Sequence, residues 1–436
     1  MTSRITIPGI PIPGILILLL GLAAPQDWRG LALASFDEAW QTIHETYYDP
    51  TFGGLDWTGV RDALRPEVER AATPDAARDV IRDMLSRLRQ SHFSLLTSPA
   101  AGGPAGEAAV PIEVRAFDAG LIVTSVDAGS PAERAGVRAG DWLTSIDGHD
   151  VAAMAATVAA EPGDGRAARL ALWRMATRAL RGQPDAPARL SLRGPDDRVR
   201  TAVVPRVREA GELVTIGHLP PLRVRTHAER LRLPGNREAG LIGFNVWMPA
   251  VAAPFAEAID RYRDASGLVI DLRGNPGGLA DMMRGLAGHL LDEPLLIGRM
   301  KMRAIELEFR ANPRRATADG RRVEPFAGPV AILIDELTGS ASECFAGGLQ
   351  SLGRARVFGV TSMGQALPAA TRELANGDVL LYAIGDFITA TGVRLERTGV
   401  VPDEVVPLSV EDLAAGRDGA LQAALAWIDR SGAAAR

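Results

Sequence analysis

Lysine is almost absent from this 436-residue chain, in which Lys301 is the single example. The other basic residues are arginines and six histidines, the formal net charge is −5 at pH 7, and no segment is densely basic. The sequence therefore gives no indication of a nucleic-acid-binding surface. A lysine can serve as a catalytic base only if it is Lys301, and the surrounding segment MKMRA (300–304) shows no sign of a buried pocket.

Cysteine is equally scarce. Cys344 stands alone, which excludes an intramolecular disulfide framework and any zinc or iron–sulfur site built from several cysteines. The sequence also lacks an HExxH motif and any pair of histidines spaced for one helix face. It has no GxxxxGK(S/T) phosphate-binding loop either. We therefore predict a protein that works without a metal or another cofactor.

One long hydrophobic run lies near the N-terminus. Arg4 precedes GILILLLGLAA (14–24), and Pro25 ends the run. The run is short against the roughly 20 residues that a membrane-spanning helix needs, and its order of charge, apolar core and small residues is typical of a secretory signal. We predict a signal peptide at residues 1–25 and export to the periplasm or the medium. An uncleaved N-terminus that associates with the membrane is the alternative.

The length and the 47% hydrophobic content predict two or three domains. Apolar residues at helical spacing indicate a small helical domain at 30–98. A stretch of small residues (100–109) separates it from a unit at 108–206, where short strands alternate with two helices. From 210 to 436, strands and helices alternate in the manner of an α/β layer architecture.

Two turns of the α/β region combine a strand end with unusual composition, and ligands of α/β sheets bind at such ends. The first is DLRGNPGGLADM (271–282). Gly277 and Gly278 allow a close backbone approach and leave N–H groups free at a helix start. Such amides can form an oxyanion hole. A tight structural turn is the alternative on these residues alone.

The second turn is LTGSASECFAGG (337–348), which places Ser340 at a helix start. There the helix dipole and the Ala341 amide favour developing negative charge, although an ordinary capping serine fits the same position. A nucleophilic serine also needs a base. Six histidines are available, and spacing alone does not single one out: His44, His92, His149, His218, His227 and His289. His92 is distinguished only because it follows Ser91 at the end of a helix, where a polar pair can protrude into a cleft.

Several segments together resemble a known family. The core of the C-terminal processing (tail-specific) serine proteases and of the tricorn core protease is similar, in order and spacing, to GLVIDLRGNPGG (267–278), TGSASECFAGGLQSLGRARVFGV (338–360) and VRLERTGVVPDEVV (393–406). Residues 36–57 and 83–96 resemble the helical part of the tricorn-like branch, and residues 120–148 resemble a PDZ domain. The resemblance implies a multidomain α/β protein: an N-terminal helical domain, a PDZ-like α+β domain, and an α/β protease core of the ClpP/crotonase-like kind.

The resemblance places the nucleophile at Ser340 and leaves Ser342 inside the helix. The tail-specific branch uses a lysine from a TFGKG-like motif, which here reads TSMGQ (361–365). Gln365 occupies the position of that lysine, and glutamine cannot accept the proton of a serine. The serine–lysine dyad is therefore excluded unless Lys301 reaches the site from elsewhere.

The tricorn branch instead uses a histidine preceded by serine, with a glutamate from an ExxGVxPD-like segment. Both are present, as Ser91-His92 and as Glu396 in ERTGVVPD. The resemblance thus implies that Ser340 attacks, that His92 takes its proton, and that Ser91 and Glu396 orient the imidazole. A neutral imidazole base with an ordinary pKa loses activity as the pH falls through about 6.5. The backbone amides that the resemblance implies for the oxyanion hole are those of Gly277 or Gly278 together with Ala341.

The function that these residues favour is a serine endopeptidase acting on peptides or proteins. The alternatives are a non-catalytic ligand- or peptide-binding protein on the same fold, as in the interphotoreceptor retinoid-binding protein modules, and an inactive scaffold that uses its PDZ unit. Neither alternative needs four polar residues, Ser340, His92, Ser91 and Glu396, to converge on one site. The PDZ-like unit either binds substrate C-termini by strand addition or positions and gates the protease core. Whether the protein is a homo-oligomer stays open.

Overall fold

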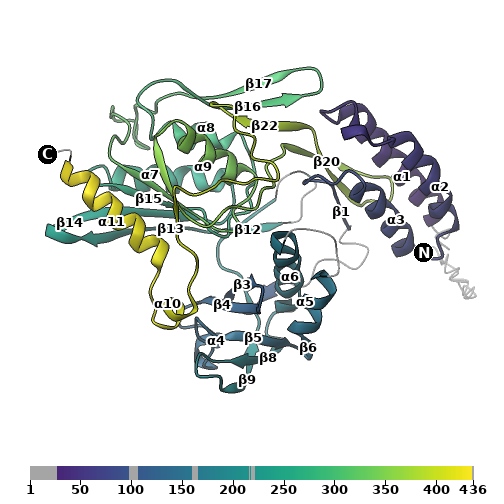
Figure 1. Cartoon of the computed structure of the whole chain (residues 1–436), viewed down its shortest axis with the longest axis horizontal. Coiled ribbons are helices and arrows are strands. Elements are labelled where there is room, and N and C mark those ends of the chain that lie inside the picture. The colour runs from purple at the N-terminus through teal and green to yellow at the C-terminus, as the bar shows by residue number, and fades with distance from the viewer. Residues whose placement is uncertain (1–26, 98–106, 160–164, 216, 218–220, 435–436) are drawn as a thin grey trace, which may run out of the picture.

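The computed structural model describes residues 27–97, 107–159, 165–215, 217 and 221–434. The predicted signal peptide, residues 1–25, lies outside the described residues. Figure 1 shows three parts: a group of N-terminal helices at one side, a mixed sheet in the centre, and a smaller α+β unit below it.

The N-terminal helices are α1 (Trp28–Thr46), α2 (Trp57–Arg70) and α3 (Pro74–Ser86). Each is preceded by a residue whose side chain accepts a hydrogen bond from the amide three positions later, which satisfies a free N–H of the first turn. These capping residues are Asp27, Asp56 and Thr73. The sequence itself therefore specifies where all three helices begin.

These helices do not build their core alone. Their buried apolar faces pack against Leu367, Leu374 and Leu380, which belong to the second half of the chain. Leu380 lies on β21 (Val379–Ala383), which pairs on one side with β20 (Ala369–Glu373) and on the other with β1 (Ser94–Leu96), the strand that follows α3. The segment between α3 and β1, which carries His92, is therefore fixed to the C-terminal half of the protein.

The α+β unit contains a sheet with the strand order β3-β4-β5-β8-β9. Helix α6 (Gly165–Leu180) covers this sheet with buried Leu172, Ala176 and Leu180. The other elements of the unit are β3 (Ile112–Phe117), β4 (Gly120–Val126), α4 (Pro131–Arg134), β5 (Trp142–Ile146), β6 (His149–Asp150), α5 (Val151–Ala159), β8 (Pro187–Arg193) and β9 (Val199–Pro205).

The central sheet has the strand order β13-β14-β15-β18-β19-β23 and is parallel except between β13 and β14. Its strands are β13 (Thr226–Leu233), β14 (Arg237–Phe244), β15 (Leu268–Asp271), β18 (Val330–Ile334), β19 (Ala355–Gly359) and β23 (Glu404–Val405). One face packs against α7 (Ala252–Arg261), α8 (Met282–Ala287) and α9 (Ala341–Ser351), and the other against α11 (Gly419–Ala434). Strands β15 and β18 read as continuous apolar runs because helices cover both faces.

A second sheet, β17-β16-β22, lies beside this core (Figure 1). It consists of β16 (Leu295–Met302), β17 (Glu306–Ala311) and β22 (Gly385–Thr389). The remaining elements are η1 (Phe52–Gly54), β2 (Ala108–Ala109), β7 (Arg181–Gly182), β10 (Val207–Arg208), β11 (Glu212–Val214), β12 (Leu222–Val224), η3 (Pro234–Asn236), η4 (Pro249–Val251) and α10 (Val410–Ala414). Among the helices of the described residues, none has both the length and the apolar character required to cross a bilayer.

The parallel order brings three loops to the same edge of the central sheet. These loops follow the carboxyl ends of β15, β18 and β19, at residues 272–278, 335–340 and 360–366. The first two contain residues that the sequence marked as candidates, and the third contains Gln365, at the position of the tail-specific lysine. The topology thus collects them where α/β sheets bind their ligands.

Candidate active site

Ser340 occupies a sharp turn between β18 and α9. Its backbone has φ 52° and ψ −120°, a conformation that costs free energy for a residue with a side chain. The Ser340 N–H donates to the Gln365 carbonyl at 2.9 Å and to Glu343 Oε2 at 3.0 Å, and these contacts hold the turn. A serine on a strained strand-to-helix turn presents its hydroxyl outward, as nucleophilic serines require.

The His92 imidazole faces this hydroxyl. His92 Nε2 lies 3.2 Å from Ser340 Oγ, and His92 Nδ1 lies 2.8 Å from Ser91 Oγ. His92 also has a positive φ, 61°, so its backbone is bent to bring the ring inward from the segment after α3. The distance to Ser340 is within the reach that a general base needs.

Glu396 completes the chain of contacts. Its Oε2 accepts hydrogen bonds from Ser91 Oγ at 2.8 Å and from the Ala366 N–H at 2.9 Å, and its Oε1 accepts from the Ser91 N–H at 3.0 Å. Because the Ser91 hydroxyl donates to the carboxylate, its oxygen is left to accept from His92 Nδ1. That tautomer leaves His92 Nε2 unprotonated and directed at the Ser340 hydroxyl.

Burial of the imidazole, together with the positive charge of Arg174 on α6, lowers the pKa of His92 to about 4. The ordinary value near 6.5 that the sequence suggested is therefore displaced towards acid pH. A base with this pKa is neutral at pH 5 and above. The ring is thus ready to accept a proton over the whole physiological range.

Beside Ser340 lies the glycine turn. The Gly277 N–H donates to Asn275 Oδ1 at 3.0 Å, so this amide is already engaged. Within the described part of the chain, the amides of Gly278 and Ala341 have no hydrogen-bond partner. A Cβ on Gly277 would lie 2.6 Å from Ser340 Cβ and 2.9 Å from the Ala341 nitrogen. Only glycine therefore leaves room in front of these amides.

The other candidates lie apart from this cluster. Ser342 is buried in α9, where its Oγ accepts from Trp247 Nε1 at 2.7 Å. Lys301 is exposed on β16 and pairs with β17 and β22. The remaining described histidines have other surroundings: His44 stacks on Trp40, His149 and His227 are exposed, and His289 packs against Phe255. His218 lies outside the described residues.

Known proteins with similar sequences point the same way. Residues 238–406 match peptidase family S41, residues 32–86 the tricorn protease C1 domain, and residues 122–161 the PDZ domain. The chain is 27% identical over 396 residues to a chloroplastic C-terminal processing peptidase of Tetradesmus obliquus, a match covering 86% of this chain and 78% of the relative. The chain is a serine-type peptidase, and its residues 238–406 match the model of family S41.

A second relative is similar over most of the chain, and a solved structure shares its fold. A carboxyl-terminal-processing protease of Picosynechococcus is 26% identical over 416 residues, which cover 90% of this peptidase and 89% of the relative. The structure of a photosystem II D1 C-terminal processing protease shares the fold, with a TM-score of 0.58, 24% identity, and coverage of 91% and 97% of the two chains. The predicted fold class of helical region, PDZ domain and protease core is confirmed.

The peptidase has one buried acid that the sequence interpretation missed. Glu343 lies three residues after Ser340 and is fully buried in α9. Its carboxylate binds the Ser340 N–H and reaches the 362–365 loop. A signal was available, because a glutamate three residues after a serine at a helix start is the spacing of a capping box.

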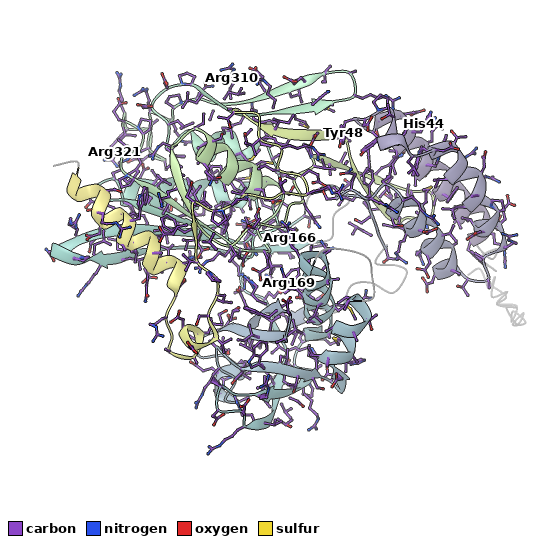
Figure 2. The ribbon with its side chains drawn as sticks, in the orientation of Figure 1. His44, Tyr48, Arg166, Arg169, Arg310 and Arg321 are labelled. Atoms are coloured by element: carbon purple, nitrogen blue, oxygen red, sulfur yellow. The ribbon has the colours of Figure 1, made fainter. Side chains whose placement is uncertain are left out.

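The PDZ domain contacts the loops beside Ser340 and Glu396. Arg166 and Arg169 lie on α6, at the side of the domain that approaches the core (Figure 2). Arg166 Nη1 donates to the carbonyls of Ser362 and Thr398 at 3.1 and 3.3 Å, and Arg174 Nη2 donates to Gln365 Oε1 at 3.4 Å. Gln365 therefore lies beside Ser340, whose N–H its carbonyl accepts, and its side chain binds Arg174.

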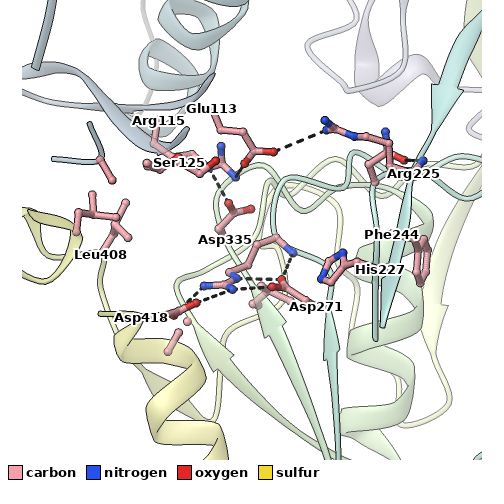
Figure 3. A pocket seen from close by; sticks show the side chains of 18 of the residues that line it. Glu113, Arg115, Ser125, Arg225, His227, Phe244, Asp271, Asp335, Leu408 and Asp418 are labelled. Atoms are coloured by element: carbon pink, nitrogen blue, oxygen red, sulfur yellow. Dashed lines mark hydrogen bonds and ion pairs between the residues drawn. The ribbon is translucent and has the colours of Figure 1, made fainter. Parts of the chain in front are cut away.

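A cleft of about 1070 Å³ lies between β3 and β4 of the PDZ domain, α10, and the ends of β15 and β18 (Figure 3). Neither Ser340 nor His92 lines it. Arg115 Nε on β3 donates to Asp335 Oδ2 at 2.8 Å across the cleft, and Asp335 Oδ1 accepts from the amides of Gly274 and Leu337. The cleft is thus separate from the pair of Ser340 and His92, although its ion pair fixes the loop that leads to Ser340.

Proposed function

We propose that this peptidase hydrolyses peptide bonds through an acyl-enzyme on Ser340, with His92, Ser91 and Glu396 completing a catalytic tetrad. The observation that carries the proposal is the continuous series of contacts from Glu396 through Ser91 and His92 to Ser340. Every hydroxyl and ring N–H in this series has an acceptor in the direction of Glu396. The arrangement can therefore remove a proton from Ser340 without rearranging the other three residues.

The first step is the attack of Ser340 Oγ on the carbonyl carbon of the substrate, as its proton passes to His92 Nε2. The imidazolium that forms keeps its Nδ1–H on Ser91 Oγ, and the Glu396 carboxylate stabilises the positive charge through the Ser91 hydroxyl. His92 then gives the proton to the leaving amine, and the C–N bond breaks. Water repeats the cycle on the acyl-enzyme and releases the second product.

The negative charge of the tetrahedral intermediate needs donors that are free before the reaction. We assign this role to the Gly278 and Ala341 amides, because the Gly277 amide is bound to Asn275. Gly277 instead contributes the empty space that its missing side chain leaves beside Ser340. The N-terminal position of Ala341 in α9 adds the favourable end of the helix dipole.

A fluorophosphonate probe tests the proposal directly. We expect one probe molecule per active chain, mapped by mass spectrometry to the peptide that contains Ser340. The Ser342→Ala variant should be labelled like the wild type, since its hydroxyl faces Trp247 rather than His92. A wild-type protein that hydrolyses peptides but carries no label on Ser340 would contradict the acyl-enzyme proposal.

The depressed pKa of His92 gives a testable pH profile. Protonation of His92 removes the base, and burial lowers its pKa to about 4. At pH 5.5 an ordinary histidine is about nine-tenths protonated, whereas His92 stays largely neutral. The acid limb of the kcat/KM profile should therefore be centred well below pH 6. Activity is lost as the pH drops through the pKa of His92 in the folded protein. A limb centred near 6.5 would show that the imidazole is solvated in the working enzyme.

The substrate is proposed to be a peptide or protein, in line with the family, and the relatives are named for processing of carboxyl termini. We also propose export, on the strength of the apolar run at residues 14–24. N-terminal sequencing of the protein from its native host should find a mature start close to Pro25 or Gln26. Cytosolic protein that retains Met1 would contradict export.

A further inference from the structure

We propose that Glu343 is a positioning residue for the catalytic reaction, which joins the nucleophile turn to the loop that holds the opposite end of the tetrad. The inference rests on the proposed function of Ser340. Glu343 does not contact His92, Ser91 or Glu396 in the described structure. It acts on the reaction through the backbone on both sides.

The carboxylate of Glu343 has a donor at every acceptor position. Oε2 accepts from the N–H groups of Ser340 at 3.0 Å and Gln365 at 2.9 Å. Oε1 accepts from Ser362 Oγ and the Gly364 N–H, both at 2.6 Å. A carboxylate offers about four lone-pair directions, so the side chain is fully satisfied although it is completely buried.

The four donors belong to two separate segments. One is Ser340 itself, held at a strained φ of 52°. The other three lie in residues 362–365, and the next residue, Ala366, donates its N–H to Glu396 Oε2 at 2.9 Å. Glu343 therefore connects the nucleophile to the amide that binds Glu396. A shift of this loop would change the position of Ser340 and of Glu396 together.

The four donors favour the ionised carboxylate, because three of them are backbone N–H groups that cannot accept a hydrogen bond from a carboxylic acid. Burial opposes ionisation and raises the pKa of Glu343 to about 7, although the hydrogen bonds to Ser362, Gly364, Gln365 and Ser340 act against that rise. The four hydrogen bonds offset the free-energy cost of burying this carboxylate. They also hold Ser340 in its strained backbone conformation.

The decisive variant is Glu343→Gln, which keeps the shape of the side chain but turns one acceptor into an NH₂ group. That group would face backbone N–H donors on one side, and the turn or the loop would have to shift. A displacement of about 1 Å at a catalytic group lowers turnover roughly 100-fold. We expect kcat per active site, counted by fluorophosphonate titration, to fall on that scale while KM changes less than about threefold.

Glu133→Gln is the matched control. Glu133 also follows a helix-capping serine by three residues, accepts from the Gly129 N–H at 2.7 Å, and is exposed on α4 of the PDZ domain. This variant should retain wild-type kcat and KM. Circular dichroism and thermal unfolding show whether each variant is folded. Active-site titration counts only competent molecules, so a lower kcat per active site reports a positioning effect rather than a loss of folded protein.

Ser362→Ala provides a second test if Glu343→Gln does not fold. It removes one of the four donors to Glu343, and a smaller fall in kcat, again with little change in KM, is expected. Unchanged kcat per active site in the folded Glu343→Gln protein, or in Ser362→Ala where the former is insoluble, would overturn the inference. Absence of label on Ser340 in the wild type would instead reject the proposed function itself.

Discussion

Ser340→Ala is expected to abolish peptide hydrolysis while the protein stays folded. The variant loses the hydroxyl that faces His92 Nε2. Removal of a catalytic serine lowers kcat by roughly 10⁴- to 10⁶-fold in serine peptidases. The turn should persist, because the backbone N–H of residue 340, not its hydroxyl, makes the contacts to Gln365 and Glu343. Hydrolysis of a fluorogenic peptide and circular dichroism measure the two halves of this expectation.

Ser342→Ala is the control for this result. The Ser342 hydroxyl is buried and binds Trp247 Nε1, so its loss should cost about 1–3 kcal/mol of stability without changing the chemistry. Activity close to wild type is expected once the protein is folded. An inactive Ser342→Ala protein beside an active Ser340→Ala protein would move the nucleophile by two residues.

The second large effect is expected at the base. His92→Ala should remove most of the turnover, because no other described imidazole is in contact with Ser340. Lys301→Met should leave turnover nearly intact, since Lys301 is exposed on β16 in the neighbouring sheet. Steady-state kinetics on the two purified variants measure this contrast. It separates a histidine mechanism from the serine–lysine dyad.

The opposite pattern would have a clear meaning. Near-normal activity in His92→Ala together with an inactive Lys301→Met protein would return this peptidase to the serine–lysine branch. The two substitutions lie in different structural surroundings, because the segment of His92 is anchored by β1 to β21 and Lys301 lies on β16. Thermal unfolding of both variants should therefore be recorded beside the kinetics, to separate a loss of stability from a loss of chemistry.

The local structure was largely predictable from the sequence. The strands at 268–271 and 330–334 are visible as apolar runs, and the helix start at Ser340 follows from the residues around it. The approach of His92 and Glu396 to Ser340 was not visible in any local pattern. That approach depends on pairings between residues hundreds of positions apart, and it was suggested only by resemblance to a family.

Two details of the site could not be predicted from the sequence. The sequence offered Gly277 and Gly278 as equal donors, and only the bond from the Gly277 N–H to Asn275 distinguishes them. The sequence analysis placed the nucleophile at the first serine of SASE, Ser340, and gave no role to Glu343. The packing of the N-terminal helices on β21, Leu367 and Leu374 was hidden as well, because it unites residues 28–96 with residues 367–383.

The distance along the chain between Ser91 and Glu396 has a consequence for biosynthesis. The two residues are 305 positions apart, and ribosomes add roughly 5–20 residues per second. At that pace, roughly 15 to 60 seconds pass between the synthesis of Ser91 and that of Glu396. A chain that is still being made therefore has the serine and the histidine without the acid that aligns them. On the proposed mechanism, the peptidase therefore gains full activity only near the end of translation, when fewer of its own segments are still unfolded.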